Sequence, residues 1–479
     1  MQIICEGHPQ IVDLSPGLQF VLHHPTVLDE PVLEGESDVD AAGAFYSSVF
    51  RDAGVFRMWY QTWPRGRDGS NTFTVACAES DDGLHWRRPG CNLVEAFGTR
   101  NNPLTDLPFH SPSVFADPDA RPPARYRAFG YCDPRRITVG TAPALNRPGY
   151  FTAHSADGLH WEIDSAEPLW PWADVITSAY DPTYHRALVA MKRWRRSAGM
   201  DRRAFMTAEW SAGQATQGVT ALVPDEYDDL QARGRGFNSA DYYGLGLMPT
   251  EGPTIGFLWN FRHQLPLGVF GDIGRVDLSI VYQLERHGKW HHFPGRPDWL
   301  SAEDAPDWAN CLYTAAYPID VGDETWLYFC GTLDFHGWCG DGVKYEEWIK
   351  TSGERKGSAR IGLIKWPKNR IMGYKSVHIE RMRLVPRRDK SPQGNLILNA
   401  VTRPGGALRA ELLDPQNQPI PGYTFSECEP IRGDHLEIPV RWKEHPSLPR
   451  FPADQPIMAR LELTDAILYA FDFTLPGLV

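Results

Sequence analysis

The sequence lacks the features that mark several large classes of protein. Its eight cysteines are scattered without a CxxC pair, so the ligand spacing of a structural zinc site is absent. No apolar run reaches about 18 residues, which predicts that no helix spans a membrane. The N-terminus has neither a basic segment nor a long apolar one, so no signal peptide is expected. A reducing cytoplasm is therefore the predicted location.

Positive charge is also scarce. The chain has 48 Lys and Arg against 60 Asp and Glu, a formal net charge of −12. Because a nucleic-acid-binding protein needs a basic face, we expect no such partner. A glycine-rich phosphate loop, a GxSxG elbow and an HExxH motif are all missing, and we predict neither a cofactor nor a metal. Long helical patterns are missing too, and only residues 303–313 and 346–356 are candidates for short helices.

Aromatic residues, glycine and proline are plentiful. The 479 residues include 17 Trp, 43 Gly and 40 Pro, and the glycines and prolines lie between short strand-like runs. This pattern is typical of an all-β protein with many turns. Each tryptophan needs either a place in the core or a flat ligand on which to stack.

One hairpin motif occurs twice. SDDGLHW at 80–86 recurs as SADGLHW at 155–161, each after a strand-like run. An Asp-Gly turn reverses the chain, and a tryptophan then lies on the returning strand. We expect the Asp and Trp residues of both copies to serve the turn and the packing between repeated units.

The repeat extends over five units. Each has an inner and an outer pair of strand-like runs, and the inner pairs begin near residues 44, 111, 176, 242 and 311. Small sheets of this kind cannot bury their faces alone, but a radial arrangement buries them against one another. The prediction is a five-bladed β-propeller over residues 1–380. From about 392 shorter alternating strands predict a second domain, a β-sandwich over 392–479.

These patterns also resemble a known group of enzymes. The run ending in MWY, the AESDDGLHW hairpin, HSPSVFADPDA, and the RAELLD and PIPGY segments near the C-terminus resemble glycoside hydrolase family 32-like proteins. That group shares a five-bladed propeller with families 43, 62, 68 and 130. The resemblance covers residues 40–473. It implies a glycoside hydrolase or transglycosidase that acts on furanosides or related glycans through paired carboxylates.

The sequence departs from the invertases within that group. Their WMNDPNG motif is absent, and the RDP triplet is absent as such. The Glu427–Cys428 pair falls in the sandwich segment, too late to supply the acid. The chain is therefore a divergent relative, and neither sucrose nor inulin is implied as its substrate.

Carboxylates that precede inner strands are the best catalytic candidates, because the starts of those strands face the central funnel of a propeller. Asp174 precedes an apolar run and follows two tryptophans, so it is expected to be partly desolvated, as a tuned carboxylate requires. We predict three catalytic residues, Asp174, Asp241 and Asp106. The predicted substrate contacts are His110, Asn102, Asn238, Trp308, Trp172, Glu36 and Asp38.

The proton donor is left open. Either a loop glutamate (Glu36, Glu226 or Glu346) serves, or an aspartate whose pKa is raised by burial does so. Two other functions compete with hydrolysis. A glycoside phosphorylase on the same fold would need a cationic cluster for phosphate, for which Arg233, Arg235 and Arg262 are candidates. A carbohydrate-binding protein without turnover is favoured by the missing family motifs.

Overall fold

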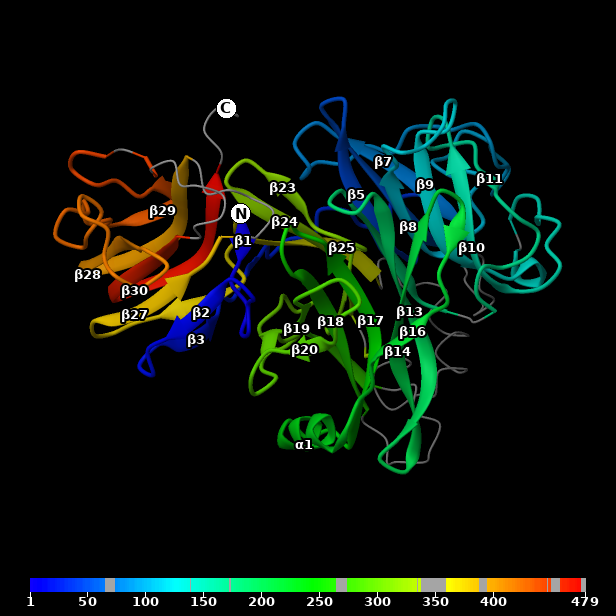
Figure 1. Cartoon of the computed structure of the whole chain (residues 1–479). Coiled ribbons are helices and arrows are strands. Elements are labelled where there is room, and N and C mark those ends of the chain that lie inside the picture. The colour runs from blue at the N-terminus through cyan, green and yellow to red at the C-terminus, as the bar shows by residue number, and fades with distance from the viewer. Residues whose placement is uncertain are drawn as a thin grey trace.

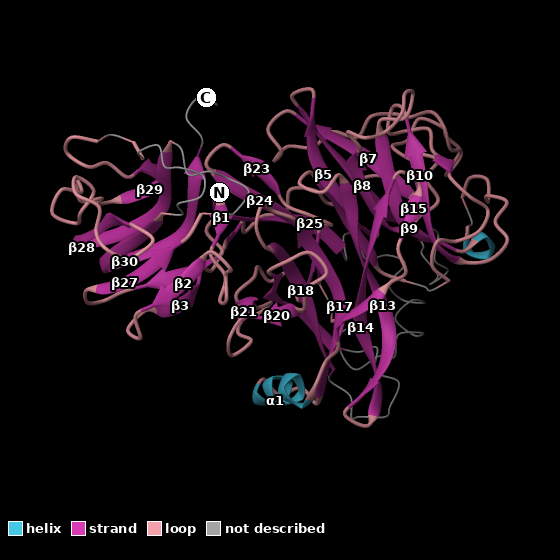
Figure 2. Cartoon of the chain, viewed as in Figure 1, coloured by secondary structure: helices cyan, strands magenta, loops and turns pink. Residues whose placement is uncertain are grey.

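The computed structural model describes the chain except for residues 65–73, 138, 172–173, 264–273, 334, 337–358, 387–393, 446, 449–456 and 475–479. The described part consists mostly of strands (Figure 2), as the all-β prediction requires. Its helices are α1 (Glu226–Gly234) and a 3-10 turn, η1 (Pro134–Arg136). The segment 303–313 forms turns and the start of a strand instead of a helix. The second helix candidate, 346–356, lies outside the described residues.

Five sets of strands form the blades, and they match the five predicted units. From the innermost strand outward, blade 1 has β5 (Gly43–Asp52), β6 (Val55–Trp63) and β7 (Val75–Ser80). Blade 2 has β8 (His110–Ala116), β9 (Tyr126–Cys132), β10 (Gly149–Ser155) and β11 (Glu162–Ile163). Blade 3 has β12 (Ile176–Asp181), β13 (Arg186–Ser197), β14 (Met200–Ser211), β15 (Gln214–Ala215) and β16 (Val219–Leu222).

The last two blades complete the set. Blade 4 has β17 (Ser239–Met248), β18 (Thr254–His263), β19 (Gly274–Gln283), β20 (Trp290–His292) and β21 (Asp298–Leu300). Blade 5 has β22 (Cys311–Thr314), β23 (Ile319–Val321), β24 (Glu324–Thr332), β25 (Ala359–Pro367) and β4 (Thr26–Val27). Within each blade the strands pair antiparallel.

The inner strands close into a ring, each contacting the next in the order β5, β8, β12, β17, β22 and back to β5. Buried serine hydroxyls connect the first three inner strands. The Ser48 hydroxyl of β5 accepts from the Val114 amide of β8 at 2.9 Å, and the hydroxyls of Ser113 in β8 and Ser178 in β12 lie 2.9 Å apart. The Thr177 hydroxyl of β12 donates to the Leu245 carbonyl of β17, and backbone bonds complete the circle: Leu247 donates to Ala316, and Ala316 donates to Ser47. The ring is therefore closed by polar links inside an apolar core.

The N-terminal segment closes the propeller. β4 forms the outer strand of blade 5, where Val27 pairs with Ile364, and the amides of Leu28 and Val32 donate to the carbonyls of Leu363 and Ile361. A strand from before blade 1 thus completes the blade that ends the circle.

The two Asp-Gly hairpins join neighbouring blades, which confirms the structural role predicted for them. In the first copy the Gly83 carbonyl accepts from the Tyr328 hydroxyl of blade 5 at 2.8 Å. In the second copy the Gly158 carbonyl accepts from the Trp59 indole of blade 1 at 2.7 Å. Asp82 and Asp157 cap the turns by accepting two backbone amides each.

The C-terminal sheet is assembled from both ends of the chain (Figure 1). Its long strands β28 (Asn395–Leu413) and β30 (Met458–Thr474) pair along their length, and β29 (Asp434–Pro439) flanks β28. The other members are β1 (Gln2–Ile3), β2 (Ile11–Leu14), β3 (Gln19–Leu22), β26 (Met372–Lys375) and β27 (Glu380–Leu384).

The sheets therefore divide the chain differently from the predicted domains, 1–380 and 392–479. Residues 2–22 and 372–384 pair in the C-terminal sheet instead of in a blade. Phe20 of β3 stacks on Phe293 next to blade 4, with ring centroids 4.9 Å apart, so this sheet packs directly against the propeller.

Helix α1 was not predicted, although its capping pattern is present in the sequence. Asp225 accepts from the amide of Asp228, whose side chain accepts from the Asp225 amide in return, which fixes the first turn. Asp229 on the same helix forms an ion pair with the fully buried Arg202. The helix covers this buried cation between blades 3 and 4.

The hairpin at Gly158 gives a direct test of the blade contacts. Its φ is +82°, and a Cβ there would lie 2.6 Å from the Trp59 ring. Gly199 has φ +79° with open space around it. Both Gly→Ala changes incur the cost of a left-handed alanine, roughly 1 kcal/mol. We expect Gly158→Ala to lower the free energy of unfolding by about 1–3 kcal/mol more than Gly199→Ala, measured by urea denaturation. Equal losses would show that the hairpin does not bear on blade 1.

Candidate active site at the propeller axis

Asp174 and His110, two of the predicted residues, meet where the inner strands of blades 2 and 3 begin. His110 is the first residue of β8, and Asp174 lies two residues before β12. The Nε2 atom of His110 is 3.1 Å from Oδ1 of Asp174. The other carboxylate oxygen forms an ion pair with the ammonium of Lys192, which reaches the axis from β13. The Asp174 side chain is 38% exposed, whereas that of Lys192 is 5% exposed.

The backbone at this point is unusual. Asp174 has φ +95°, and Ser111, next to His110, has φ +54°. Left-handed backbone at a residue with a side chain costs free energy and persists only where surrounding contacts impose it. The Ser111 amide donates to the Gln61 side chain at 3.0 Å, and its hydroxyl donates to the Ile176 carbonyl at 3.0 Å. These bonds fix the two strand starts that present His110 and Asp174.

Asp241, the third predicted residue at the axis, forms a second ionic group. Its Oδ2 lies 3.0 Å from Arg203 of β14 and 3.0 Å from Nε2 of His263 at the end of β18. All three side chains are less than a tenth exposed. A buried carboxylate with two cationic or hydrogen-bonding partners is compensated, and its geometry is fixed.

Aromatic rings join the two ionic groups. The Lys192 ammonium lies 3.6 Å from the centroid of the Tyr243 ring, and the Arg203 guanidinium lies 5.6 Å from the same ring. Tyr243 also packs on the imidazole of His336 at 4.7 Å. On the other side, the Tyr46 ring meets His110 edge-on at 5.4 Å. The two carboxylates therefore belong to one connected cluster, which we call the axial cluster: Asp174, His110, Lys192, Asp241, Arg203, His263, Tyr243 and His336.

The charges of the axial cluster set its protonation states. Burial by itself raises the pKa of Asp174, but the Lys192 ammonium and the bond to His110 outweigh it and hold that pKa far below the usual range. Burial opposes ionisation of Asp241 as well, yet His263 and Arg203 keep its pKa lowered. Burial, together with Arg203 and Lys192, lowers the pKa of His336 to about 3. Both carboxylates are thus ionised at neutral pH, and neither is the burial-raised acid considered from the sequence.

The third predicted catalytic residue does not join the cluster. Asp106 accepts from the Trp161 amide at 2.7 Å and lines a cavity between blades 1 and 2 whose lining shares no residue with the axial cluster. Burial raises the pKa of Asp106. Nearby Asn102 is buried and uses its side chain to hold a loop, donating to the carbonyls of Val94 and Thr99.

The other predicted contacts are dispersed. Glu36 forms an ion pair with Arg88 at 2.8 Å and is 78% exposed, and the half-buried Asp38 lies in the same loop. Trp308 is buried, donates to the Asp29 carbonyl at 2.8 Å and stacks on a core phenylalanine, so it is a packing residue. Asn238 is half-buried one residue before β17, and its backbone amide donates to the backbone carbonyl of His263. Trp172 lies outside the described residues.

Sequence reasoning missed the basic members of the axial cluster. Lys192 and Arg203 lie on the second and third strands of blade 3, in the runs AMKRWRR and DRRAF. Among so many basic residues, no local pattern distinguishes the two that turn inward. Only the register between β13 and β14, together with contact to β17, selects them.

Two of the three arginines considered for phosphate binding form ion pairs away from the axial cluster. Arg262 forms ion pairs with Asp277 and Asp298, and Arg235 contacts Asp298 at 2.7 Å. Their charges are neutralised inside blade 4. Arg233 is an exposed residue in the last turn of α1.

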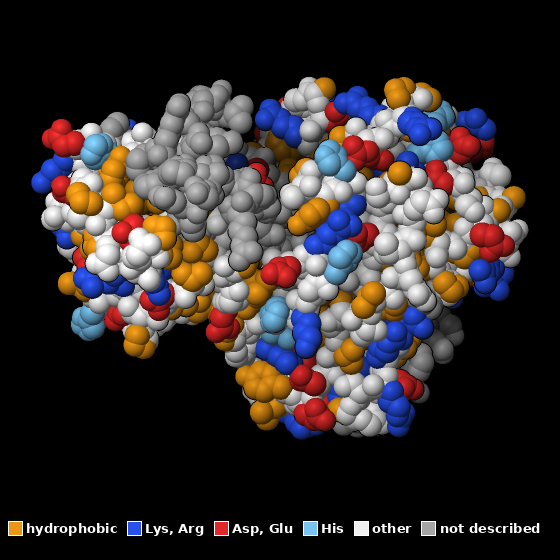
Figure 3. All heavy atoms as spheres, viewed as in Figure 1, with side chains coloured by type: hydrophobic (Ala, Val, Ile, Leu, Met, Phe, Trp, Pro, Cys, Tyr) orange, Lys and Arg blue, Asp and Glu red, His pale blue; other side chains and the backbone are white. Residues whose placement is uncertain are grey.

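Two further features concern the described ranges only. Within them, no three His, Cys, Asp or Glu side chains are arranged to hold a metal ion. None of the helices in the same ranges has the length and apolar character needed to cross a bilayer. Charged side chains of both signs are interspersed over the face of the molecule shown in Figure 3.

No protein-family model matches the chain, and no curated protein matches its sequence. Among solved structures it is similar to the Bombyx mori GH32 β-fructofuranosidase BmSUC1, at 11% identity over 94% of this chain and 95% of that one, with a TM-score of 0.41. It is also similar to the α-L-arabinofuranosidase PaAbf62A from Podospora anserina, at 10% identity over 72% and 98%, TM-score 0.39.

A third similar structure is the exo-β-1,3-galactanase Pc1,3Gal43A from Phanerochaete chrysosporium, at 10% identity over 92% of this chain and 100% of that one, TM-score 0.39. All three are glycoside hydrolases by name.

His336 provides a test of the electrostatics at the axis. An unfolded histidine takes up a proton near pH 6.5, whereas folded His336 does so only near pH 3. Its contribution to stability is therefore present above pH 6.5 and is lost as the pH falls toward 3. We expect the loss of unfolding free energy between pH 7 and pH 5 to be smaller in His336→Gln than in the native chain, by about 1–2 kcal/mol.

Urea denaturation at the two pH values measures the difference, with His85→Gln as the control because the His85 side chain is 89% exposed. An unchanged pH dependence in His336→Gln would mean that the imidazole is not held neutral by the cluster.

Proposed function

We propose that the chain is a glycoside hydrolase or transglycosidase whose reaction takes place at the axial cluster. The observation that carries this proposal is the Asp174 carboxylate, which is partly exposed, kept ionised by Lys192 and His110, and located where inner strands begin. Glycoside cleavage needs such a carboxylate to attack the anomeric carbon, to activate water, or to stabilise an oxocarbenium-like transition state. The resemblance of the sequence to furanoside-acting hydrolases supports furanosides or related glycans as substrates.

In this proposal the two carboxylates differ in role. Asp174 has exposed surface and faces the substrate, so it is the catalytic carboxylate. Asp241 is 7% exposed and held by Arg203 and His263, so it is a positioning residue that fixes the cations and Tyr243 beside Asp174. The proton that the leaving oxygen needs comes from neither of them, because both are ionised.

None of the glutamates considered as acids has a contact with Asp174 among the described residues. Glu36 forms an ion pair with Arg88, and Glu226 is an exposed residue in the first turn of α1. Glu346 lies outside the described residues. Substrates with a leaving group that needs little protonation, such as 4-nitrophenyl glycosides, therefore test Asp174 without depending on the identity of the acid.

One observation favours a second candidate, the phosphorylase. The axial cluster contains Lys192 and Arg203, each balanced by a carboxylate, and three histidines whose ring N–H groups can donate to phosphate oxygens. Cleavage that requires added phosphate and releases a sugar phosphate would favour phosphorolysis, whereas cleavage in its absence favours hydrolysis.

The cellular location and the division into domains are also proposals. We place the enzyme in the cytoplasm, consistent with cysteines that are unpaired and mostly buried in the described part. We divide the chain into a catalytic propeller and a C-terminal β-domain that braces it through contacts such as Phe20 on Phe293.

Replacement of the two carboxylates tests the site. We expect Asp174→Asn to lower kcat on 4-nitrophenyl furanosides or pyranosides by roughly 10³-fold, because the isosteric amide removes the negative charge. We expect Asp241→Asn to lower it by about 10–100-fold through loss of positioning. Initial-rate kinetics on a panel of these glycosides measures both.

Asp119→Asn is the matched control, since Asp119 lies beyond the far end of β8 and contacts Tyr180 and His185. Full turnover in Asp174→Asn, with a normal unfolding midpoint, would remove the axial site from consideration.

Removal of the Lys192 charge gives a pH test. Without the ammonium, burial raises the pKa of Asp174, so the carboxylate is protonated at a higher pH. We expect the acid limb of the kcat profile of Lys192→Met to move upward by about 1–3 pH units. Lys365→Met is the control, because Lys365, like Lys192, lies over an aromatic ring and pairs with a carboxylate, here those of Trp326 and Glu324 at the propeller periphery. An unshifted limb in Lys192→Met would show that Asp174 does not govern turnover.

A further inference from the structure

The two Asp-Gly hairpins share their sequence and their turn but not the use of their tryptophans. The indole of each donates to the carbonyl of its own turn glycine, Trp86 to Gly83 at 3.1 Å and Trp161 to Gly158 at 3.0 Å. Trp86 then packs edge-on against Tyr328 of blade 5, with centroids 5.8 Å apart. Trp161 instead lines the cavity between blades 1 and 2. Both indoles are half-buried against the core, and that of the second copy also contributes to the lining of this cavity.

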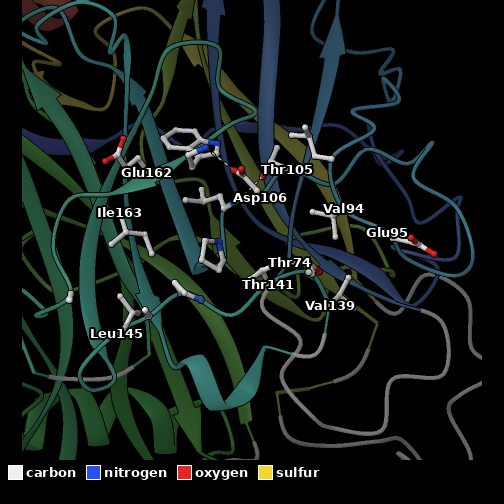
Figure 4. A pocket seen from close by; sticks show the side chains of 18 of the residues that line it. Thr74, Val94, Glu95, Thr105, Asp106, Val139, Thr141, Leu145, Glu162 and Ile163 are labelled. Carbon is white, nitrogen blue, oxygen red and sulfur yellow. Dashed lines mark hydrogen bonds between the residues drawn. The ribbon is translucent and has the colours of Figure 1, made fainter.

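This cavity, which we call the blade 1–2 cavity, has a volume of about 780 Å³, within the range of small-molecule binding sites. Figure 4 shows Ile163 and Leu145 on one side and Val94 and Val139 on the other. Polar groups lie between these side chains, among them the hydroxyls of Thr141 and Ser165, whereas the hydroxyls of Thr74 and Thr105 are bonded to Thr62 and to the Val75 carbonyl. A cavity with a tryptophan and a lining of both polar and apolar groups suits a ligand with both kinds of surface.

Asp106 is prepared to accept a hydrogen bond in this cavity. Its Oδ1 accepts from the Trp161 amide at 2.7 Å, so the carboxyl group and the aromatic residue are held together. A carboxyl group carries several lone pairs, so Asp106 can accept a further hydrogen bond from a ligand while it holds the Trp161 amide. The backbone amide of Asp106 donates to Leu159 of the same hairpin, which fixes the position further.

The charges around the cavity indicate the class of ligand. Its lining contains three carboxyl groups, Asp106, Glu95 and Glu162, against one guanidinium, Arg100, which pairs with Glu95 at 3.9 Å. An acidic lining repels phosphates, sulfates and uronic acids. Hydroxyl groups of a neutral sugar, by contrast, donate to carboxylates, and the CH face of the sugar packs on an indole.

We propose that the blade 1–2 cavity is a second carbohydrate-binding site, for a neutral oligosaccharide, in which Trp161 supplies the stacking surface and Asp106 accepts from sugar hydroxyls. The site shares no residue with the axial cluster and does not depend on the reaction proposed there. It assigns the second hairpin a function beyond its turn.

Native affinity electrophoresis tests the proposal, with arabinan, galactan or dextran in the gel and polygalacturonate as the anionic arm. All samples are the full chain carrying Asp174→Asn, so cleavage at the axis does not consume the probe. We expect at least one neutral polysaccharide to retard this protein and polygalacturonate not to do so. Addition of Trp161→Ala should weaken the apparent affinity at least tenfold, while Trp86→Ala in the matched hairpin should leave it within twofold.

Thr141→Trp guards against misfolding of the hairpin variant, because Thr141 is an exposed loop residue that lines the cavity. Its larger side chain should fill the cavity and abolish retardation without disturbing a turn. The proposal is overturned if no neutral polysaccharide retards the protein, if only polygalacturonate does, or if Thr141→Trp and a folded Trp161→Ala both bind as tightly as their parent.

Discussion

The structure depends on the closed ring of inner strands. Each blade is a small sheet with two apolar faces, and only its neighbours cover them, so no blade is stable alone. Buried hydroxyls of Ser48, Ser113 and Ser178 and backbone bonds through Ala316 connect successive inner strands inside this core. An unpaired hydroxyl there would cost about 1–3 kcal/mol, so the links favour one register over alternatives. That register brings the starts of β8, β12 and β17 to a common point.

Ionic balance is the second constraint, and it follows from the first. The ring brings two carboxylates into a largely buried place, where an isolated charge is very unfavourable. Blade 3 supplies the compensation, because Lys192 of β13 pairs with Asp174 and Arg203 of β14 pairs with Asp241. The pairs are not equivalent, since only Asp174 keeps exposed surface and a strained backbone. This asymmetry separates a residue available to a ligand from one that holds the arrangement in place.

The features that could be predicted from the sequence are those that depend on residues close together in the chain. The five units, their inner strands and the placement of Asp174, His110 and Asp241 at the axis depend on local alternation and on the start of a strand, and these were predicted. Asp106 precedes an inner strand too, but its carboxyl is captured by the Trp161 amide, a contact 55 residues away that no local pattern encodes. Lys192 and Arg203 are selected by strand register, and β1–β3 by pairing with strands more than 350 residues later, so all of these were missed.

Duplication explains why the most visible motif was not the most informative about catalysis. Each turn is capped by its own aspartate, Asp82 or Asp157, and accepts a hydrogen bond from the neighbouring blade at a glycine carbonyl. Because the turn needs no other contacts, it can recur wherever two blades meet. Its tryptophan is fixed by the turn glycine, but what lies beyond the indole depends on the neighbouring loop. Beside blade 5 that neighbour is Tyr328, which covers Trp86. Beside blade 1 it is the loop carrying Asp106, which leaves a cavity instead of a contact. Equal local sequences thus acquire different surroundings, and functional differences between repeats arise from the segments that connect them.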